Sequence, residues 1–181
     1  MIFVTDAGGK CVHVSSDWHK LTGQSPIDAI DHGWIECIHP DDRSIVRETR
    51  DAATKRGVEY TLRYRLTRPD GSYRWVGAGG VPSFGISDNR FIGFLGSITE
   101  LTEGAVDAIK AYGTVGTFTP PPPHTATLPS CSLDKVADYL LLAHSLIEGD
   151  GGKEALPDVR RALFKIGQAL AKRSLEKARL N

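Results

Sequence analysis

The strings YTLRYRLT at residues 60–67, RPDGS at 68–72 and YRWVGAGGV at 73–81 decide the fold that this sequence predicts. In the first string apolar or aromatic residues alternate with polar ones, which is the period of a half-buried β-strand. The second string has turn chemistry, because Pro69 fixes its φ angle and Gly71 can take the left-handed conformation. The three strings together predict an antiparallel β-hairpin.

Further strand-like segments lie on both sides of this hairpin. Near the start of the chain, residues 2–5 and 11–15 flank a tight turn, and the string 90–101 is rich in Ile, Phe and Leu. Turn residues between two apolar runs are typical of a hairpin. We therefore expect two strands before the central hairpin and one after it.

A helix is predicted between the first two strands and the last three. The string HPDDR at 39–43 opens it, because proline and acidic side chains favour the first turn of a helix. The helix should run from Asp41 to about Arg56 and end at Gly57. The order of elements predicts an α+β fold, with a five-stranded antiparallel sheet and helices on one face.

The sequence divides into three zones. Residues 1–103 form the predicted sheet domain, and residues 104–132 form a Gly/Pro-rich linker that contains four consecutive prolines at 120–123. Residues 133–181 predict a C-terminal helical hairpin, whose first helix is capped by Ser132 or Asp134. Its helices present one apolar stripe of Val136, Leu140, Ala143 and Ile147 and another of Val159, Leu163, Ile166 and Leu170.

Composition narrows the class of protein. Lys and Arg together number 22, as do Asp and Glu, so the formal net charge is zero and no general affinity for nucleic acid or membrane surfaces is expected. The three cysteines, Cys11, Cys37 and Cys131, are odd in number and widely spaced, which favours a reducing compartment. The first residues lack the features of a signal peptide. We expect a cytoplasmic protein.

Five strings in the first zone carry a family resemblance. They are TDAGG at 5–9, LTG at 21–23, GW at 33–34 with HPDDR at 39–43, YRL at 64–66 with DGSYRWV at 70–76, and GFLGSITELTE at 93–103. Their order and spacing resemble the PAS family. The resemblance implies a five-stranded sheet with helices over one face, a small core that can hold a ligand, and a sensing or dimerisation role. The Asp-Ile-Thr with which that family usually closes is replaced by Glu100-Leu101-Thr102.

The cofactors of some PAS proteins are not expected here. Flavin photosensors of this family use a cysteine within an Asn-Cys-Arg string, whereas Cys37 lies in WIECIH and is interpreted as a buried structural cysteine. A haem ligand would be a histidine on the long helix, and residues 41–56 contain none. His39 is interpreted as a residue that starts the helix. We expect neither haem nor covalent flavin, and no metal site.

A ligand pocket remains compatible with the sequence. Glycines at 77, 79, 80, 93 and 96 either leave room for a small molecule or serve close packing of the backbone, and we favour packing. No convergent set of acids, bases or nucleophiles is apparent, so we expect no enzyme activity. The predicted pocket walls are Ile38, Val46, Leu62, Tyr64, Phe94 and Ile98.

The preferred function is a signal-sensing and protein-interaction module of bacterial-type signal transduction. The alternative is the sensory fragment of a histidine kinase or cyclic-nucleotide signalling enzyme whose output domain is absent from this chain. A homodimer is expected, because a free helical hairpin cannot hide two apolar stripes. Residues 133–180 should contribute to its interface or dock on the sheet, and a kinase or other signalling protein is a further partner. His144 lies where a phospho-acceptor could, but its neighbours Ser145 and Ile147 do not fit that role.

Overall fold

The computed structural model describes residues 1–102 and 110–180. Glu103, the first linker residues 104–109 and Asn181, the last residue of the predicted tail, lie outside the described residues. Within the described ranges, none of the helices has the length and apolarity that crossing a membrane requires.

The sheet is antiparallel and has six strands, in the order β2-β1-β5-β4-β3-β6. The predicted central hairpin is confirmed: Arg68 N donates to Ser72 O at 2.8 Å, and Gly71 has a φ of 79°. The α+β class is confirmed as well, with one strand more than expected. The strands are β1 (Ile2–Thr5), β2 (Cys11–Val14), β3 (Tyr60–Thr67), β4 (Tyr73–Phe84), β5 (Phe91–Glu100) and β6 (Tyr112–Val115).

Short helices and the predicted long helix cover one side of the sheet, here called the inner face. The long helix, α2 (Arg43–Arg56), follows a 3-10 turn at Pro40–Asp42 and ends at Gly57, whose φ of 60° gives a left-handed cap. It packs against β3 and β6. Two shorter elements, α1 (Trp18–Thr22) and the 3-10 helix η1 (Gly33–Cys37), complete this layer.

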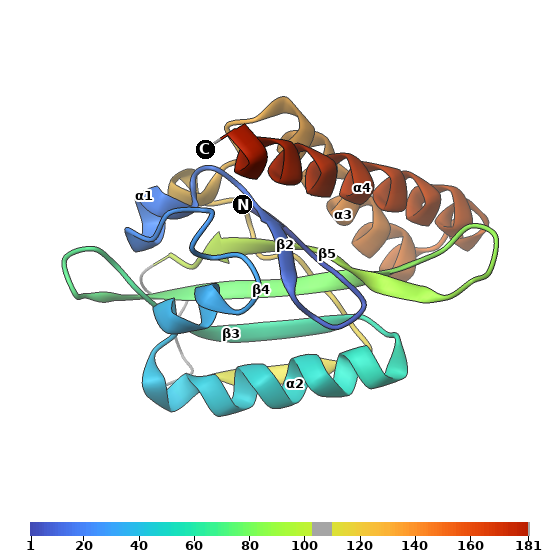
Figure 1. The fold of residues 1–181 in the computed structure, drawn as a ribbon. Helices are drawn as coiled ribbons and strands as arrows, with labels where there is room; N and C mark the ends of the chain where they lie inside the picture. Colours follow the sequence, from blue (N-terminus) through green and yellow to red (C-terminus); the bar gives the residue numbers. More distant parts are fainter. Residues whose placement is uncertain (103–109, 181) are drawn as a thin grey trace.

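The helical hairpin covers the opposite side, the outer face, so helices do not lie on one face only. Figure 1 shows α3 (Ser132–Asp150) and α4 (Leu156–Leu180) across the sheet from α2. Their contact with the sheet is a second apolar core, separate from the inner one. The sheet is therefore the middle of three layers. The buried members of the outer core are Ile2, Val4, Val81, Leu95, Phe118, Ala137, Leu141, Leu163 and Leu170.

The sixth strand comes from the segment that the sequence assigned to a linker. β6 pairs with the edge of β3, from Tyr60 opposite Val115 to Arg63 opposite Tyr112. A Cβ at Gly113 would lie 1.9 Å from Thr49 Oγ1 of α2, so glycine permits this close approach. The chain then crosses the outer face and returns to the start of α3.

The predicted apolar stripe is confirmed on one helix of the hairpin and is wrong on the other. On α4 the predicted stripe is confirmed, with Leu163 and Leu170 each 1% exposed. On α3 it is wrong, since Val136 is exposed and the buried positions are Asp134, Ala137, Leu141 and His144. The expected cap is also wrong: Cys131 occupies the N-cap without a side-chain cap bond, and Asp134 accepts a hydrogen bond from Ser15 Oγ at 2.8 Å.

Candidate functional site

An internal cavity of about 40 Å³ lies between the inner face of the sheet and its helices. Five strands supply most of its wall, because alternate residues of each strand point to the same side. The helical layer closes it from α1, η1 and α2. The lining residues are Phe3, Thr5, Cys11, Val14, Trp18, Trp34, Arg50, Tyr60, Leu62, Tyr64, Ala78 and Ile98.

The predicted pocket residues are all buried, but they do not all meet at one space. Leu62, Tyr64 and Ile98 line the cavity. Ile38 and Val46 instead line a groove of about 450 Å³ that runs beside α2 at the surface. The ring of Phe94 packs edge-on against Tyr60, with 5.0 Å between ring centroids. The structure thus divides the predicted set between a cavity, a groove and the core.

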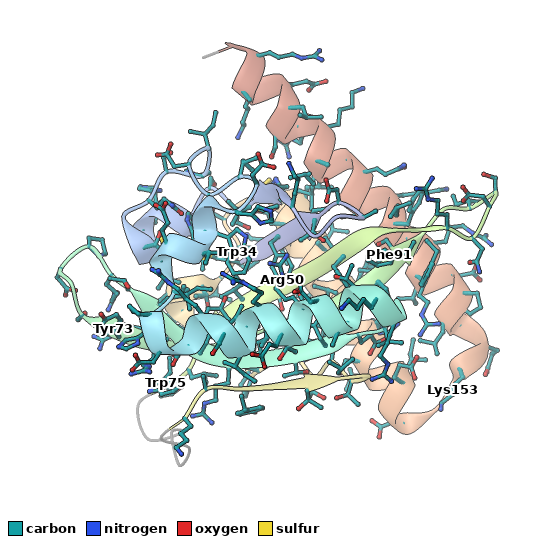
Figure 2. All side chains as sticks on the ribbon, turned by 60° about the horizontal axis from the view of Figure 1, so that its bottom comes forward. Trp34, Arg50, Tyr73, Trp75, Phe91 and Lys153 are labelled. Atoms are coloured by element: carbon teal, nitrogen blue, oxygen red, sulfur yellow. The ribbon has the colours of Figure 1, made fainter. Side chains whose placement is uncertain are left out.

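Arg50 and Trp34 form the partition between the cavity and the groove, since both residues line both spaces. The guanidinium carbon of Arg50 lies 4.5 Å from the Trp34 ring centroid, which is a cation–π contact. Arg50 Nη2 also donates to the carbonyl of Gly9. Figure 2 shows Arg50 reaching from α2 toward Trp34. Sequence reasoning missed Arg50, although its position four residues after Val46 places it beside the buried stripe of the helix.

Burial determines the charge state of the ionisable groups in the cavity wall. Burial raises the pKa of the Cys11 thiol to about 11, and burial likewise raises the pKa of Tyr60 and of Tyr64. These groups stay neutral near pH 7, and Arg50 supplies the positive charge. No Asp, Glu, His or Lys is found among the described residues that line the cavity. The cavity wall is almost entirely apolar, and Arg50 is the charged residue among the described residues that line it.

Cys37 and His39, the residues considered as cofactor ligands from the sequence, make hydrogen bonds within the fold. Cys37 is buried outside the cavity lining, and its Sγ lies 3.4 Å from Gln24 Oε1 as a donor. Gln24 Oε1 also accepts from Trp18 Nε1 at 3.0 Å, which joins α1 to η1. At the start of the long helix, His39 Nδ1 accepts from Asp41 N at 3.2 Å, as predicted for a residue that starts a helix.

A buried ion pair that sequence reasoning did not identify ties α2 to β3. Asp42, 2% exposed, accepts from the backbone N and Nε of Arg65 at 2.9 Å each and from Nη2 at 2.6 Å. Burial acts to raise the pKa of Asp42, but the hydrogen bonds from Arg65 outweigh it and lower that pKa. This pair fixes the helix that carries Arg50 against the sheet.

The glycines of the sheet serve close packing, as favoured from the sequence. A Cβ at Gly77 would lie 2.4 Å from Pro121, and one at Gly79 would lie 2.4 Å from the Phe118 ring. Both glycines face outward, where the segment after β6 crosses the sheet. A Cβ at Gly96 would lie 2.3 Å from the ring of Phe3. Glycine at these positions leaves the space that neighbouring side chains of the same chain occupy.

The end of β5 is linked to the segment that leads into the hairpin. Glu100 N donates to Thr127 Oγ1 at 3.2 Å, and Glu100 Oε1 lies 3.5 Å from Arg74 Nε. Glu100 itself is 8% exposed. Glu100, which replaces the aspartate of the usual Asp-Ile-Thr triad, therefore connects the sheet to the segment that precedes α3.

Comparisons with known proteins agree with this geometry. A sequence profile described as the PAS fold matches residues 11–98. The uncharacterized protein y4lL of Sinorhizobium fredii is 37% identical over 103 residues, which are 57% of this chain and 12% of that protein. White collar 2 protein of Neurospora crassa is 34% identical over 70 residues, which are 39% of this chain and 13% of that protein. The chain spans about an eighth of the length of these curated relatives.

A solved structure shares the fold. It is the N-terminal domain of a diguanylate cyclase with a PAS/PAC sensor from Marinobacter aquaeolei, with a TM-score of 0.50 and 17% identity. The likeness covers 55% of this chain and 92% of that one. Together, the profile match and the shared fold show that residues 11–98 of this chain form a PAS domain.

Proposed function

We propose that this chain is a non-catalytic, signal-sensing and protein-interaction module of bacterial-type signal transduction, in which the sheet relays the state of the cavity to the α3–α4 hairpin. The observation that carries the proposal is the alternation along β1. Phe3 lines the cavity, while its neighbours Ile2 and Val4 belong to the outer core beneath the hairpin.

The sheet suits a relay because both of its faces are packed. A protein interior is dense, so a displacement of one wall moves the side chains that touch it. β4 and β5 repeat the arrangement of β1: Ala78 and Ile98 line the cavity, whereas Val81 and Leu95 lie in the outer core. Three adjacent strands thus connect the two layers.

The ligand in this proposal is small and carries a hydrogen-bond acceptor or negative charge for Arg50. A space of about 40 Å³ holds little more than one or two water molecules. A larger ligand requires the Arg50 side chain to leave Trp34, which would join the cavity to the surface groove. Haem and covalently bound flavin have no place in the proposal.

Native mass spectrometry tests the ligand. Purified wild-type protein is expected to retain a small molecule, or to gain one from a panel of small carboxylates, with one bound per chain. Ala78→Val places two added carbons in the cavity and should abolish that binding. Gly149→Ala, at a helix position where a Cβ would meet nothing within 4 Å, is the matched control. Binding that survives Ala78→Val unchanged would place the ligand elsewhere and refute the cavity as the sensor.

The proposal includes a homodimer through the free side of α3. Four apolar side chains on that side are exposed, from 42% at Val136 to 68% at Tyr139, with Leu142 and Leu146 between them. Covering such a patch with a second copy would remove it from water. Leu142→Glu with Leu146→Glu should shift the protein to monomer in sedimentation analysis without changing its fold. A wild-type monomer at high micromolar concentration would contradict the dimer.

A second candidate is the sensory fragment of a histidine kinase or cyclic-nucleotide signalling enzyme. It is favoured by the share of the relatives that the chain matches, 12% and 13%, because the matching region is a small part of each of those proteins. In either case we place the protein in the cytoplasm, which suits its three unpaired cysteines. Sequencing the surrounding gene decides between the two: an in-frame kinase or cyclase domain would select the second.

A further inference from the structure

A group of ionisable side chains lies where the hairpin meets the edge of the sheet. Glu59 directly precedes β3, His144 and Glu148 stand one turn apart on α3, and Arg160 comes from α4. One ligand atom from each of the first three residues lies within 4.8 Å of the other two. Residues far apart in the sequence thus converge at the junction of the two units.

The surroundings of His144 leave its imidazole able to coordinate a cation. Its side chain is completely buried, which rules out phosphoryl transfer to it in this conformation. Arg160 Nε donates to His144 Nε2 at 3.1 Å, so Nε2 carries a lone pair and the proton of the neutral ring lies on Nδ1. Burial, followed by the charge of Arg160, lowers the pKa of His144 and keeps the ring neutral near pH 7.

Both carboxylates lie close to the imidazole, because one oxygen from each is within 4.8 Å of the ligand nitrogen of His144. Glu59 Oε1 is 3.5 Å from His144 Nε2, close to the roughly 3.4 Å that separates two ligands of a tetrahedral ion with bonds near 2.1 Å. Two ionised carboxylates this close repel each other, and a cation between them removes that repulsion.

Arg160 supplies that positive charge in the structure. Its Nη2 lies 2.7 Å from Glu148 Oε1 and 3.7 Å from Glu59 Oε1. The guanidinium thus contacts the same three groups that a metal ion would bind. Its side chain is 47% exposed, so it can swing out to solvent without leaving an uncompensated buried charge.

We propose that Glu59, His144 and Glu148 form a binding site for a divalent transition-metal ion of the zinc class, which takes the place of the Arg160 guanidinium. One imidazole and two carboxylates suit Zn²⁺ and not Mg²⁺, which prefers oxygen ligands alone. The half-exposed Glu148 opens the site to solvent, which can fill the remaining coordination positions. The bound ion would fasten α3 to the strand edge. The proposal is independent of any ligand in the cavity.

Isothermal titration of tag-free, chelator-treated full chain with Zn²⁺ tests the site, and Co²⁺ serves as an optical probe of its geometry. We expect one ion per chain and no competition from Mg²⁺. Glu59→Gln and Glu148→Gln should each weaken zinc binding at least tenfold, because each removes a ligand. Arg160→Gln should strengthen it, since the competing cation is gone. His32→Ala, at an exposed histidine outside the group, should leave it unchanged.

His144→Ala removes a buried side chain and has to be shown to fold before it is used. Glu148→Gln tests the site even if His144→Ala does not fold, because the Glu148 side chain is only partly buried and its substitution should not disturb the fold. Absence of zinc binding to folded wild-type protein at millimolar zinc would overturn the proposal. Equal affinity in the wild type and in Glu148→Gln and Glu59→Gln would overturn it as well, and a weaker affinity in Arg160→Gln would show that the guanidinium supports binding.

Discussion

The inner and outer faces of the sheet are both buried, but they are built from different chemistry. The inner face is rich in aromatic and polar groups, with Tyr60, Tyr64, Trp18 and Arg50 around a small cavity. The outer core beneath the hairpin is mainly aliphatic, for example Ile2, Leu95 and Leu163, with Phe118 as an aromatic member. The outer layer also holds polar contacts, such as Ser15 Oγ with Asp134 Oδ2 at 2.8 Å and His13 Nδ1 with Ser174 Oγ at 2.7 Å. The small cavity, in contrast, lies on the inner face. In the proposed relay, the inner face holds the sensing cavity and the outer face connects the sheet to the hairpin.

Charge placed in the outer core should have the largest effect. Leu163 and Leu170 are each 1% exposed, and truncating a buried leucine to alanine already costs about 2–5 kcal/mol. Because glutamate adds the cost of burying a polar group, Leu163→Glu with Leu170→Glu should detach the hairpin from the sheet. Far-UV circular dichroism should record a loss of helix. Gln168→Glu, at an exposed position of α4, is the control and should retain the wild-type spectrum.

If the double variant kept its helical signal and melting temperature, the hairpin would not depend on the outer core. The hairpin would then fold independently of the sheet, and the outer face would not need it as a covering layer.

The inner face should respond next to loss of the Asp42–Arg65 pair. Removing one partner of a buried ion pair costs about 3–5 kcal/mol, and because Arg65 is 26% exposed we expect Asp42→Asn to cost about 2–3 kcal/mol. Asp41→Asn, at a carboxyl that is 76% exposed, should change the free energy of unfolding by less than about 0.5 kcal/mol. Urea unfolding of both variants measures the difference, and equal effects would show that the pair does not fix α2.

The same pair predicts a dependence on pH. The pKa of Asp42 is lowered in the folded protein, so the folded state binds this proton less readily than the unfolded state does. Its stabilisation is therefore complete above the unfolded pKa of about 3.9 and disappears as the pH falls through the folded value. The stability difference between wild type and Asp42→Asn should shrink over that range. A difference that stayed constant down to pH 2 would contradict the assignment.

The smallest effect is expected at a glycine of the outer face. A Cβ at Gly79 would lie 2.4 Å from the ring of Phe118 and 2.3 Å from Tyr60 O. Overpacking of this kind costs about 1–3 kcal/mol, so Gly79→Ala should lower the melting temperature modestly. Gly79→Ala in a Phe118→Ala background should cost less than in the wild type, because the ring is gone. Additive effects of the two changes would show that Phe118 does not limit this position.

The sequence predicted the elements that depend on local pattern. The alternation at 60–67 and the boundaries of the helix ending at Gly57 are local, and the structure has both. Trp75, in the second strand of the predicted hairpin, is half-buried. Its ring lies within reach of the guanidinium groups of Arg63 and Arg65, at 5.6 and 5.5 Å. Those arginines alternate with the buried residues of β3 and share the outer side with Trp75.

Features that depend on distant partners were missed. β6 has four residues in a Gly/Pro-rich context, and its pairing with β3 bridges about fifty residues of sequence. The stripe on α3 was misassigned because that helix has apolar residues nearly all round. Its buried side includes Asp134 and His144, whose partners come from elsewhere in the chain. Of the cavity, three wall residues were identified from strand alternation, whereas Arg50 was not, because a charged helix residue is usually solvated.

Hydrogen–deuterium exchange of Ala78→Val tests the relay most directly. The substitution acts on the inner face only, since Ala78 lines the cavity and has no place in the outer core. The account predicts altered exchange in α3 and α4 as well as around the cavity. Asp41→Asn, at a carboxyl that is 76% exposed, is the control and should leave the hairpin's exchange unchanged. Changes in Ala78→Val confined to the cavity walls would contradict a relay through the sheet.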